Sequence, residues 1–526
     1  MKKVIIMKMA ALLTVFSLLA GCGGNSSDGK DADDKNYEVN VDDIKLSVSN
    51  TPVQSTGGEA LTSDYHPDIL FKADNDYNNP LITNLFCADP TSVEYNGRLY
   101  VYGTNDNQQY LEKGDSENTY ECIKSMIIIS TDDMVNWRYE GEINTAEIAP
   151  WIRASWAPSI VSREEADGLT HFYLYFSNGG VGVGALTATD PTGPWSDPLG
   201  EPLISSKTEG LDNCPIPFDP GVCIGDNGVG WLAFGGGKAW DGSDYMPGTT
   251  RICRLGEDML SIDSEIAKIP APYFFEASEL NYINDTYVYT FNTSWEDRTD
   301  WDWDTMGMAP PSCSMCYMTS KTPLDADSWE YRGYYLKNPG ELNMGYGNNH
   351  SHLDKYDGRY YLFFHSQLLQ KERGIEGGFR SLCSYEAEVN EGTVTINSCY
   401  AGKDGTPQIK KLDPYCVNQA ETVWLTDCEY ISENDLILAR CSGENVIGVK
   451  GVDFGEGSGA FAAKVKGKGS IELRIDSFDS EPAAILSFDC ADWTAVYDKV
   501  SISDTHNIFL VMSGDFDFDE WEFLKK

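Results

Sequence analysis

The fold of this chain is decided by residues 86–102, which read FCADPTSVEYNGRLYVY. An acidic residue, Asp89, stands before a proline, and a short apolar segment, the turn Asn96-Gly97 and an alternating Tyr-rich segment follow. An Asn-Gly pair between two alternating segments is a strong signal for a tight β-hairpin. The stretch therefore predicts a hairpin with a carboxylate at its entrance.

The same pattern returns four more times, at intervals of roughly 60–70 residues, which suits a propeller repeat once insertions are allowed. Each unit reads as two hairpins, and therefore as four strands. The repeats begin at Trp156, Phe218, Phe275 and Asn349. Five such units predict an all-β fold, a five-bladed β-propeller, in which the first strand of each blade lines the central axis.

Three carboxylates stand at the openings of these units. Asp89, Asp219 and Glu276 open the first, third and fourth units, and we place all three at the same phase of the repeat. Carboxylates around one funnel repel one another, so at least one should have a raised pKa. Such a set suits glycoside hydrolysis, in which a carboxylic acid protonates the leaving oxygen and a carboxylate activates water. The alternative, simple turns or caps among 82 acidic residues, is weakened by the common phase.

The composition limits the partners of the chain. A net charge of −43 argues against nucleic acid and against anionic membrane surfaces, and it suits a protein that acts on a neutral polymer. Of the 14 cysteines, 13 remain once Cys22 is set apart. This odd number is scattered along the chain, which favours buried free thiols over a disulfide scaffold.

The N-terminus has the features of an export signal. Residues 1–22 combine a basic start, an apolar run too short for an ordinary membrane span, and the ending Leu19-Ala20-Gly21-Cys22. This ending resembles the bacterial lipoprotein signal, in which Cys22 is lipidated and becomes the mature N-terminus; the alternative is a plain secretory signal. Residues 23–65, with few aromatics, predict a disordered tether. We expect the protein on the extracellular face of a bacterial membrane, lipid-anchored or secreted.

Two folded domains are predicted after the tether. The five repeated units occupy residues 66–412. Alternating strands in residues 413–526 predict a separate β-sandwich.

Six motifs occur in order between Leu81 and Lys411: Ala88-Asp89-Pro90, Trp156-Ala157-Pro158, Phe218-Asp219-Pro220, Phe275-Glu276-Ala277-Ser278, Gly347-Asn348-Asn349-His350 and Phe379-Arg380-Ser381. Together they resemble glycoside hydrolase family 43. The resemblance implies a five-bladed propeller that cleaves arabinofuranosyl or xylosyl bonds with inversion.

The resemblance also implies roles for the carboxylates. Asp89 would be the general base that activates water, and Glu276 the general acid. Asp219 would keep the pKa of the acid raised and orient it. Glu279 is a competitor for the acid role, but its phase in the repeat does not match.

Three further residues of this domain match the family, each with a structural alternative. Arg380 would reach the sugar in the innermost subsite, or form a surface salt bridge. His350 would ligate a calcium ion or contact the water network at the propeller axis, or be a hydrogen-bonded core residue; His352 departs from the commoner order of histidines and leaves open which ring points inward. Trp156 would stack on a sugar face, or pack within its blade.

The C-terminal domain resembles carbohydrate-binding module family 6. The matching stretches are 451–455, 471–477 and 516–523. The resemblance implies a structural calcium ion, with Glu421 and Asp519 as candidate ligands from opposite ends of the domain, and Trp493 as a sugar-stacking residue. The stretch that usually helps to build the binding cleft is much shortened before Val452, so the module can also be only a structural brace.

This combination of domains most resembles arabinoxylan arabinofuranohydrolases. We expect an exo-acting, inverting α-L-arabinofuranosidase that acts on arabinoxylan or its oligosaccharides, without an organic cofactor. One alternative is a β-xylosidase of the same family. Another is a non-catalytic surface lipoprotein that binds glycans, although such a protein would not need three acidic positions.

Overall fold

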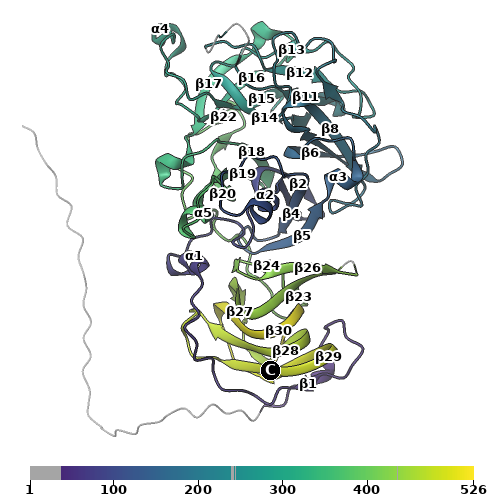
Figure 1. The fold of residues 1–526 in the computed structure, drawn as a ribbon, viewed down its shortest axis with the longest axis vertical. Coiled ribbons are helices and arrows are strands. Elements are labelled where there is room, and N and C mark those ends of the chain that lie inside the picture. The colour runs from purple at the N-terminus through teal and green to yellow at the C-terminus, as the bar shows by residue number, and fades with distance from the viewer. Residues whose placement is uncertain (1–36, 239–241, 243–244, 435) are drawn as a thin grey trace, which may run out of the picture. The chain divides into compact units, whose positions relative to one another are not determined.

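Five antiparallel sheets follow one another along the chain and form the five blades of a β-propeller (Figure 1). A computed structural model describes residues 37–238, 242, 245–434 and 436–526. The predicted signal sequence, with Cys22, and the first part of the predicted tether lie outside these ranges. Within the described ranges, no helix combines the length and the apolar character that crossing a membrane requires.

The blades are built from consecutive strands. Blade one contains β2 (Ala88–Tyr95), β3 (Arg98–Thr104), β4 (Met126–Thr131) and β5 (Trp137–Ile143). Blade two contains β6 (Trp156–Glu164), β7 (Thr170–Ser177), β8 (Gly182–Ala188) and β9 (Ile204–Ser205). Blade three contains β10 (Gly221–Ile224), β11 (Gly230–Phe234), β12 (Arg251–Arg254) and β13 (Ala267–Lys268). Blade four contains β14 (Phe274–Ile283), β15 (Thr286–Thr293), β16 (Met315–Ser320) and β17 (Glu330–Leu336). Blade five contains β18 (Ser351–Tyr356), β19 (Arg359–Ser366) and β20 (Ser381–Ala387).

The helices are short and lie in the connections. They are α1 (Phe71–Asp74), α2 (Asp106–Lys113), α3 (Thr145–Ile148), α4 (Trp303–Met306) and α5 (Leu368–Glu372). Single 3-10 turns are η1 (Val41–Asp43), η2 (Asp68–Leu70), η3 (Gly179–Val181), η4 (Asp226–Gly228), η5 (Ala326–Ser328) and η6 (Pro339–Leu342). A small hairpin, β21 (Val389–Asn390) with β22 (Thr395–Ile396), follows blade five. The predicted five-bladed propeller is confirmed, but blade five has three strands where four were predicted.

Each blade packs on both faces against its neighbours, and the apolar runs in the blade strands follow from this. In β4, Ile127 and Ile129 belong to the cluster shared with blade five, which includes Tyr361. Met126 and Ile128 alternate with them and belong to the cluster shared with blade two. A strand that is buried on both faces reads as a continuous apolar run.

The ring closes where the chain before β2 meets the last blade. The amide of Leu81 donates to the carbonyl oxygen of Leu382 at 2.8 Å, and the amide of Cys87 donates to that of Arg380 at 3.0 Å. These bonds attach the first blade to the last one. They also bring Arg380, which directly precedes β20, close to the start of β2.

The C-terminal module consists mainly of four long strands, β27 (Leu436–Asp453), β28 (Ser458–Ile475), β29 (Ala484–Lys499) and β30 (Thr505–Lys525). Short strands complete its sheet: β1 (Val53–Gln54), β23 (Asn418–Gln419), β25 (Leu425–Thr426) and β26 (Glu429–Glu433). The strand β24 (Thr422–Val423) pairs instead with β5, so it extends blade one of the propeller. The module and the propeller are therefore joined by backbone pairing.

Three glycines in register mark the line along which the long strands bend. Gly514 pairs with Gly443 on one side and with Gly469 on the other. Gly514 has a φ of 132°, and a Cβ there would lie 2.3 Å from a backbone oxygen of β28, so only glycine fits. Cys441 and Ile447 lie on opposite sides of this line and belong to the same apolar core. The sheet therefore wraps around its own core, which fits the predicted β-sandwich.

Residues 38–65 correct the predicted tether. Leu46 is buried, and the amide and hydroxyl of Ser47 donate to the Glu520 carboxylate at 2.8 and 2.7 Å. β1 pairs in parallel with β29. The prediction of disorder is wrong for these residues, because Ile44, Leu46 and Val48 alternate and pack as one apolar side on the module. We call residues 38–65 the strap.

The 13 cysteines of the described ranges are all free thiols, and most of them are buried. This agrees with the preference for free thiols over a disulfide scaffold.

Candidate active site

A cavity of about 150 Å³ lies where the inner strands of the blades begin. Its lining residues are Asp89, Tyr120, Trp156, Ala157, Phe218, Asp219, Glu276, Asn348, His350 and Arg380. Every site residue that the sequence predicts in the propeller is among them. The structure therefore brings together three carboxylates from blades one, three and four.

A bulge at the start of the inner strand positions these side chains. In β2, Ala88 pairs with Thr104 and Thr91 with Tyr102, so three steps on β2 face two steps on β3. β6 and β14 show the same offset at their starts. Four residues at these openings have a positive φ: Asp89 (49°) and Ala157 (34°) directly after the first pair, Ala277 (62°) after the Glu276–Asn292 pair, and Asp219 (47°) two residues before β10. Bulges of this kind redirect side chains, often next to active sites.

Glu276 does not share the phase of the two aspartates. Asp89 and Asp219 are themselves the residues with positive φ, whereas blade four has Ala277 at that position. Glu276 is one residue earlier and has the register of Trp156 in blade two. The predicted common phase is therefore wrong by one residue for Glu276, although its side chain lines the same cavity.

Asp89 is a buried carboxylate with several donors. Its Oδ1 lies 2.8 Å from Nη1 of Arg380 and 3.5 Å from Nδ1 of His350, and its Oδ2 accepts a hydrogen bond from the Thr104 hydroxyl at 2.7 Å. Burial alone would raise the pKa of Asp89, but the Arg380 guanidinium and the His350 ring outweigh it and hold this pKa well below its usual range. Asp89 is therefore ionised at neutral and mildly acidic pH.

His365 supports the backbone of Asp89 and was missed in the sequence. Its Nδ1 accepts a hydrogen bond from the Asp89 amide at 3.1 Å, and its Nε2 lies 3.0 Å from the Asn348 carbonyl oxygen. The same Nδ1 also lies 3.1 Å from Oδ1 of Asp89, so this ring contacts both the backbone and the carboxylate of Asp89. Burial lowers the pKa of His365, which favours the neutral form of the ring.

Asp219 and Glu276 are neighbouring carboxyl groups. The amide of Ala277, directly after Glu276, donates to Oδ2 of Asp219 at 2.9 Å. Burial first, and then the charge of Asp219, raise the pKa of Glu276 to about 8. Among the described residues, Oε1 of Glu276 has no hydrogen-bond partner. Glu276 is thus a protonated acid at neutral pH, the opposite state to that of Asp89.

Aromatic side chains form one wall of the cavity. The indole Nε1 of Trp156 donates to the carbonyl oxygen of Tyr120 at 3.0 Å, and the two rings meet edge to face. The Tyr120 ring covers the guanidinium of Arg380, with 4.9 Å between Cζ and the ring centroid. Tyr120 was missed, because it belongs to an insertion between β3 and β4 whose sequence is not repeated in the other units.

A second buried pair lies on the propeller axis outside this cavity. Oε1 of Glu279 is 3.3 Å from Nδ1 of His352, and Oε2 accepts a hydrogen bond from the Ser159 hydroxyl at 3.1 Å. Glu279 does not line the cavity, so the structure does not favour it as the acid. His350, not His352, faces the cavity and Asp89. Among the described residues, no group of three or more His, Cys, Asp or Glu side chains is arranged to hold a metal ion.

Trp493 lies in the C-terminal module and is not part of the cavity. Its half-buried ring has the ammonium groups of Lys464 and Lys466 at 5.5 and 5.8 Å from the ring centroid. The strap passes close by, since the side-chain amide of Asn50 donates to the Trp493 carbonyl oxygen at 3.3 Å.

Glu421 and Asp519 are both buried and interact electrostatically, and each has a cationic neighbour. Oδ2 of Asp519 is 2.5 Å from the Lys464 ammonium, and Oε1 of Glu421 is 3.3 Å from Nε of Arg138. Among the described residues, Oε2 of Glu421 has no hydrogen-bond partner. The two carboxylates would supply part of the oxygen shell that calcium needs, and the Lys464 ammonium would compete with the ion for Asp519.

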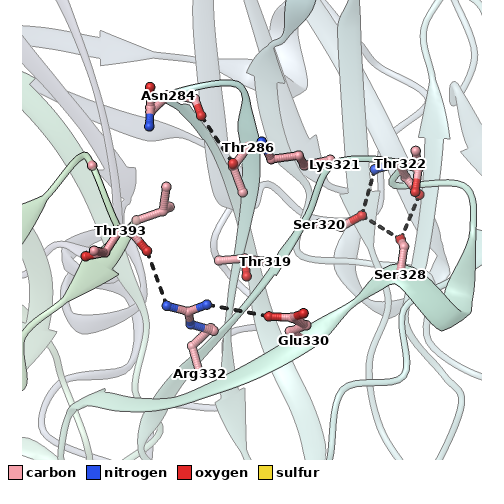
Figure 2. A pocket seen from close by; sticks show the side chains of 12 residues that line it. Asn284, Thr286, Thr319, Ser320, Lys321, Thr322, Ser328, Glu330, Arg332 and Thr393 are labelled. Carbon is pink, nitrogen blue, oxygen red and sulfur yellow. Dashed lines mark hydrogen bonds and ion pairs between the residues drawn. The ribbon is translucent and has the colours of Figure 1, made fainter.

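A larger hollow, of about 400 Å³, lies at the end of β14 opposite to Glu276. Figure 2 shows its polar side chains turned toward one another: Arg332 contacts Glu330 at 3.6 Å and the Thr393 carbonyl oxygen at 3.2 Å, and the hydroxyls of Ser320 and Ser328 are 2.6 Å apart. None of the predicted site residues lines it. The smaller axial cavity, with its acid and its ionised carboxylate, is the candidate active site.

An ionised and a protonated carboxyl group in one cavity are the two groups that glycoside hydrolases use. Residues 77–394 match the family described as "Glycosyl hydrolases family 43", and the chain belongs to this family.

Two relatives and one solved structure cover most of the chain. The Arabinoxylan arabinofuranohydrolase of Bacillus subtilis (strain 168) is 34% identical over 85% of this chain and 92% of its own length. The Arabinoxylan arabinofuranohydrolase of Paenibacillus polymyxa is 32% identical over 85% of this chain and 74% of its own length. A crystal structure of the family 43 arabinoxylan arabinofuranohydrolase from Bacillus subtilis, in complex with cellotetraose, superimposes with a TM-score of 0.77 at 33% identity, covering 86% of this chain and 98% of that one.

Proposed function

We propose that the protein is an exo-acting, inverting α-L-arabinofuranosidase that removes arabinofuranosyl side chains from arabinoxylan. The observation that carries the proposal is the single small cavity in which an ionised Asp89 and a protonated Glu276 meet. The choice of arabinose over xylose rests on the two relatives named arabinoxylan arabinofuranohydrolases.

The two carboxyl groups divide the work of an inverting hydrolysis. Glu276 donates its proton to the glycosidic oxygen while the bond from this oxygen to the anomeric carbon breaks. A water molecule attacks the anomeric carbon from the opposite face and gives a proton to Asp89. Asp219 keeps the proton on Glu276 until the substrate arrives, because its negative charge disfavours a second carboxylate nearby.

The size of the cavity supports exo action. Its volume of about 150 Å³ is below the roughly 300–1,000 Å³ of sites for drug-sized ligands, so it suits one terminal sugar rather than a length of polymer. Trp156, Tyr120 and Phe218 provide apolar surface for the sugar ring, and Arg380 provides charged hydrogen-bond donors. The xylan chain would then remain outside the cavity.

Hydrolysis of the p-nitrophenyl α-L-arabinofuranoside and β-D-xyloside tests this proposal. We expect cleavage of the arabinofuranoside; strong xyloside cleavage without arabinose release would favour the β-xylosidase alternative. Glu276→Gln should abolish arabinose release from arabinoxylan while polymer binding remains, because a carboxamide is far too weak an acid to protonate the leaving oxygen. If the native protein binds arabinoxylan but hydrolyses neither glycoside, the alternative of a non-catalytic glycan-binding lipoprotein would be favoured.

We also propose that the C-terminal module acts as a brace rather than a second sugar site. Two lysines already contact the Trp493 ring, and the module extends blade one through β24. Trp493→Ala should then leave retention on insoluble arabinoxylan unchanged, and a clear loss of retention would assign a sugar site to this ring.

We propose that the protein is exported and anchored to the outer face of a bacterial membrane through a lipid on Cys22. The support is the sequence of residues 1–22, with its apolar run and its small residues before the cysteine. Cys22→Ser should move the protein from the membrane fraction to the soluble fraction; an unchanged distribution would exclude this anchor.

A further inference from the structure

Asp106 is a buried carboxylate that neither the sequence motifs nor the cavity lining single out. It is the first residue of α2 and is fully buried. Its Oδ1 accepts from Nη2 of Arg380 at 2.8 Å, and its Oδ2 accepts from Nε of Arg380 at 2.9 Å. Oδ2 also lies 3.1 Å from the Arg380 amide and 3.0 Å from the side-chain amide of Asn118.

Arg380 contacts Asp106 through Nε and Nη2, and it contacts Asp89 through Nη1. Two parallel hydrogen bonds to Asp106 leave Nη1 to donate to Oδ1 of Asp89 at 2.8 Å. A guanidinium has five N–H groups, so one hydrogen on each of Nη1 and Nη2 has no partner among the described residues. Arg380 lines the cavity, and the Tyr120 ring covers one of its faces. The free hydrogens are therefore available to a bound sugar.

We propose that Asp106 is a positioning residue, which fastens Arg380 so that only Nη1 contacts Asp89. An arginine and a carboxylate prefer two parallel hydrogen bonds. Without Asp106, Arg380 would form this arrangement with Asp89 and occupy lone pairs that must accept a proton from water. This inference rests on the proposed role of Asp89 as the base.

The geometry also explains why two acids share one arginine. Asp106 and Asp89 are both deeply buried and lie on opposite sides of the guanidinium. Asp106 takes the bidentate edge, so its charge stabilises Arg380 without any role at the sugar. Asp89 receives a single bond from Arg380 on Oδ1, which also contacts the rings of His350 and His365, so the acceptor capacity for water is on Oδ2 beside Thr104.

Asp106→Asn tests the proposal directly. The amide has the same shape, but it replaces one of the two acceptors of Arg380 by a donor. We expect kcat to fall about 100-fold, the size of effect that a misplaced active-site group produces, with a smaller change in KM. Asp115→Asn is the matched control, because Asp115 lies in the same insertion with an exposed side chain; it should keep native kcat. Native kcat in Asp106→Asn would overturn the proposal.

A double-mutant cycle separates positioning from a general structural role. If Asp106 acts through Arg380, Asp106→Asn should cause less than about a twofold further loss in an Arg380→Ala background. A second full loss in that background would overturn the proposal. This comparison also decides the question if Asp106→Asn alone does not fold, because the double variant removes both partners of the Asp106–Arg380 ion pair, while Asp89 keeps its contact with His350.

The assay uses whichever of the two p-nitrophenyl glycosides the native protein cleaves. A wrong choice between arabinose and xylose would therefore appear in the native protein, whereas failure of the inference would appear only in the variants.

Discussion

Replacing Asp219 by asparagine tests how the acid in the cavity keeps its proton. Burial and the charge of Asp219 raise the pKa of Glu276 to about 8, so Glu276 is protonated below that pH and loses its proton as the pH rises through it. Asp219→Asn keeps the shape and an acceptor for the Ala277 amide, but removes the charge. The charge of Asp219 is the second cause of this shift after burial, and a neighbouring charge typically shifts a carboxyl pKa by roughly one to three units.

We therefore expect the alkaline limb of kcat/KM in Asp219→Asn to move down by roughly two pH units. The assay should follow arabinose released from arabinoxylan across the pH range, because p-nitrophenolate leaves with little help from an acid. Asp226→Asn, an exposed position on blade three, is the matched control and should keep the native limb. An unmoved alkaline limb in a folded, active Asp219→Asn variant would refute the reasoning.

The remaining predictions concern stability. EDTA should leave the Tm unchanged, because the Lys464 ammonium, 2.5 Å away, already faces Asp519; a calcium-dependent rise in Tm would contradict this. Lys464→Met should lower the free energy of unfolding by about 3–5 kcal/mol, since it leaves a buried carboxylate unpaired, and a change near zero in urea unfolding would show that the pair does not matter. Leu46→Ala should cost about 2–5 kcal/mol, and native stability in the same measurement would mean that the strap is not packed on the module.

The propeller was predictable because its signals are local and repeated. Each inner strand opens on a short motif and turns at Asn-Gly, Asp-Gly or a similar pair, and the pattern occurs five times. The carboxylates at these openings were predictable for the same reason. Their register was not, because a bulge adds one residue at the openings of blades one, two and four, and only the strand pairing shows that Ala277, not Glu276, is equivalent to Asp89.

Two of the residues that were missed, Asp106 and Tyr120, lie in the insertion between β3 and β4. The corresponding insertion of blade four, residues 294–314, is equally long but has a different sequence, so no repeat marks these two residues. His350 and His352 are two residues apart on extended backbone, so both side chains point toward the axis. They lie at different depths along the axis, and they therefore contact different carboxylates, Asp89 and Glu279.

The strap was mispredicted because average composition hides a short alternation. Its polar residues suggest disorder, yet three apolar side chains, at 44, 46 and 48, are enough to pack it on the module. Composition measures how much apolar surface a segment has, whereas docking depends on which face carries it.

We propose that Asp89 and Glu276 act from opposite sides of one bound sugar in a single displacement. Proton NMR of the arabinose first released from an α-linked arabinoxylan is the decisive experiment for this mechanism, because it distinguishes the two anomers before they equilibrate. We expect the β anomer, which corresponds to inversion. The α anomer as first product would contradict it, since retention requires a carboxylate that attacks the sugar itself.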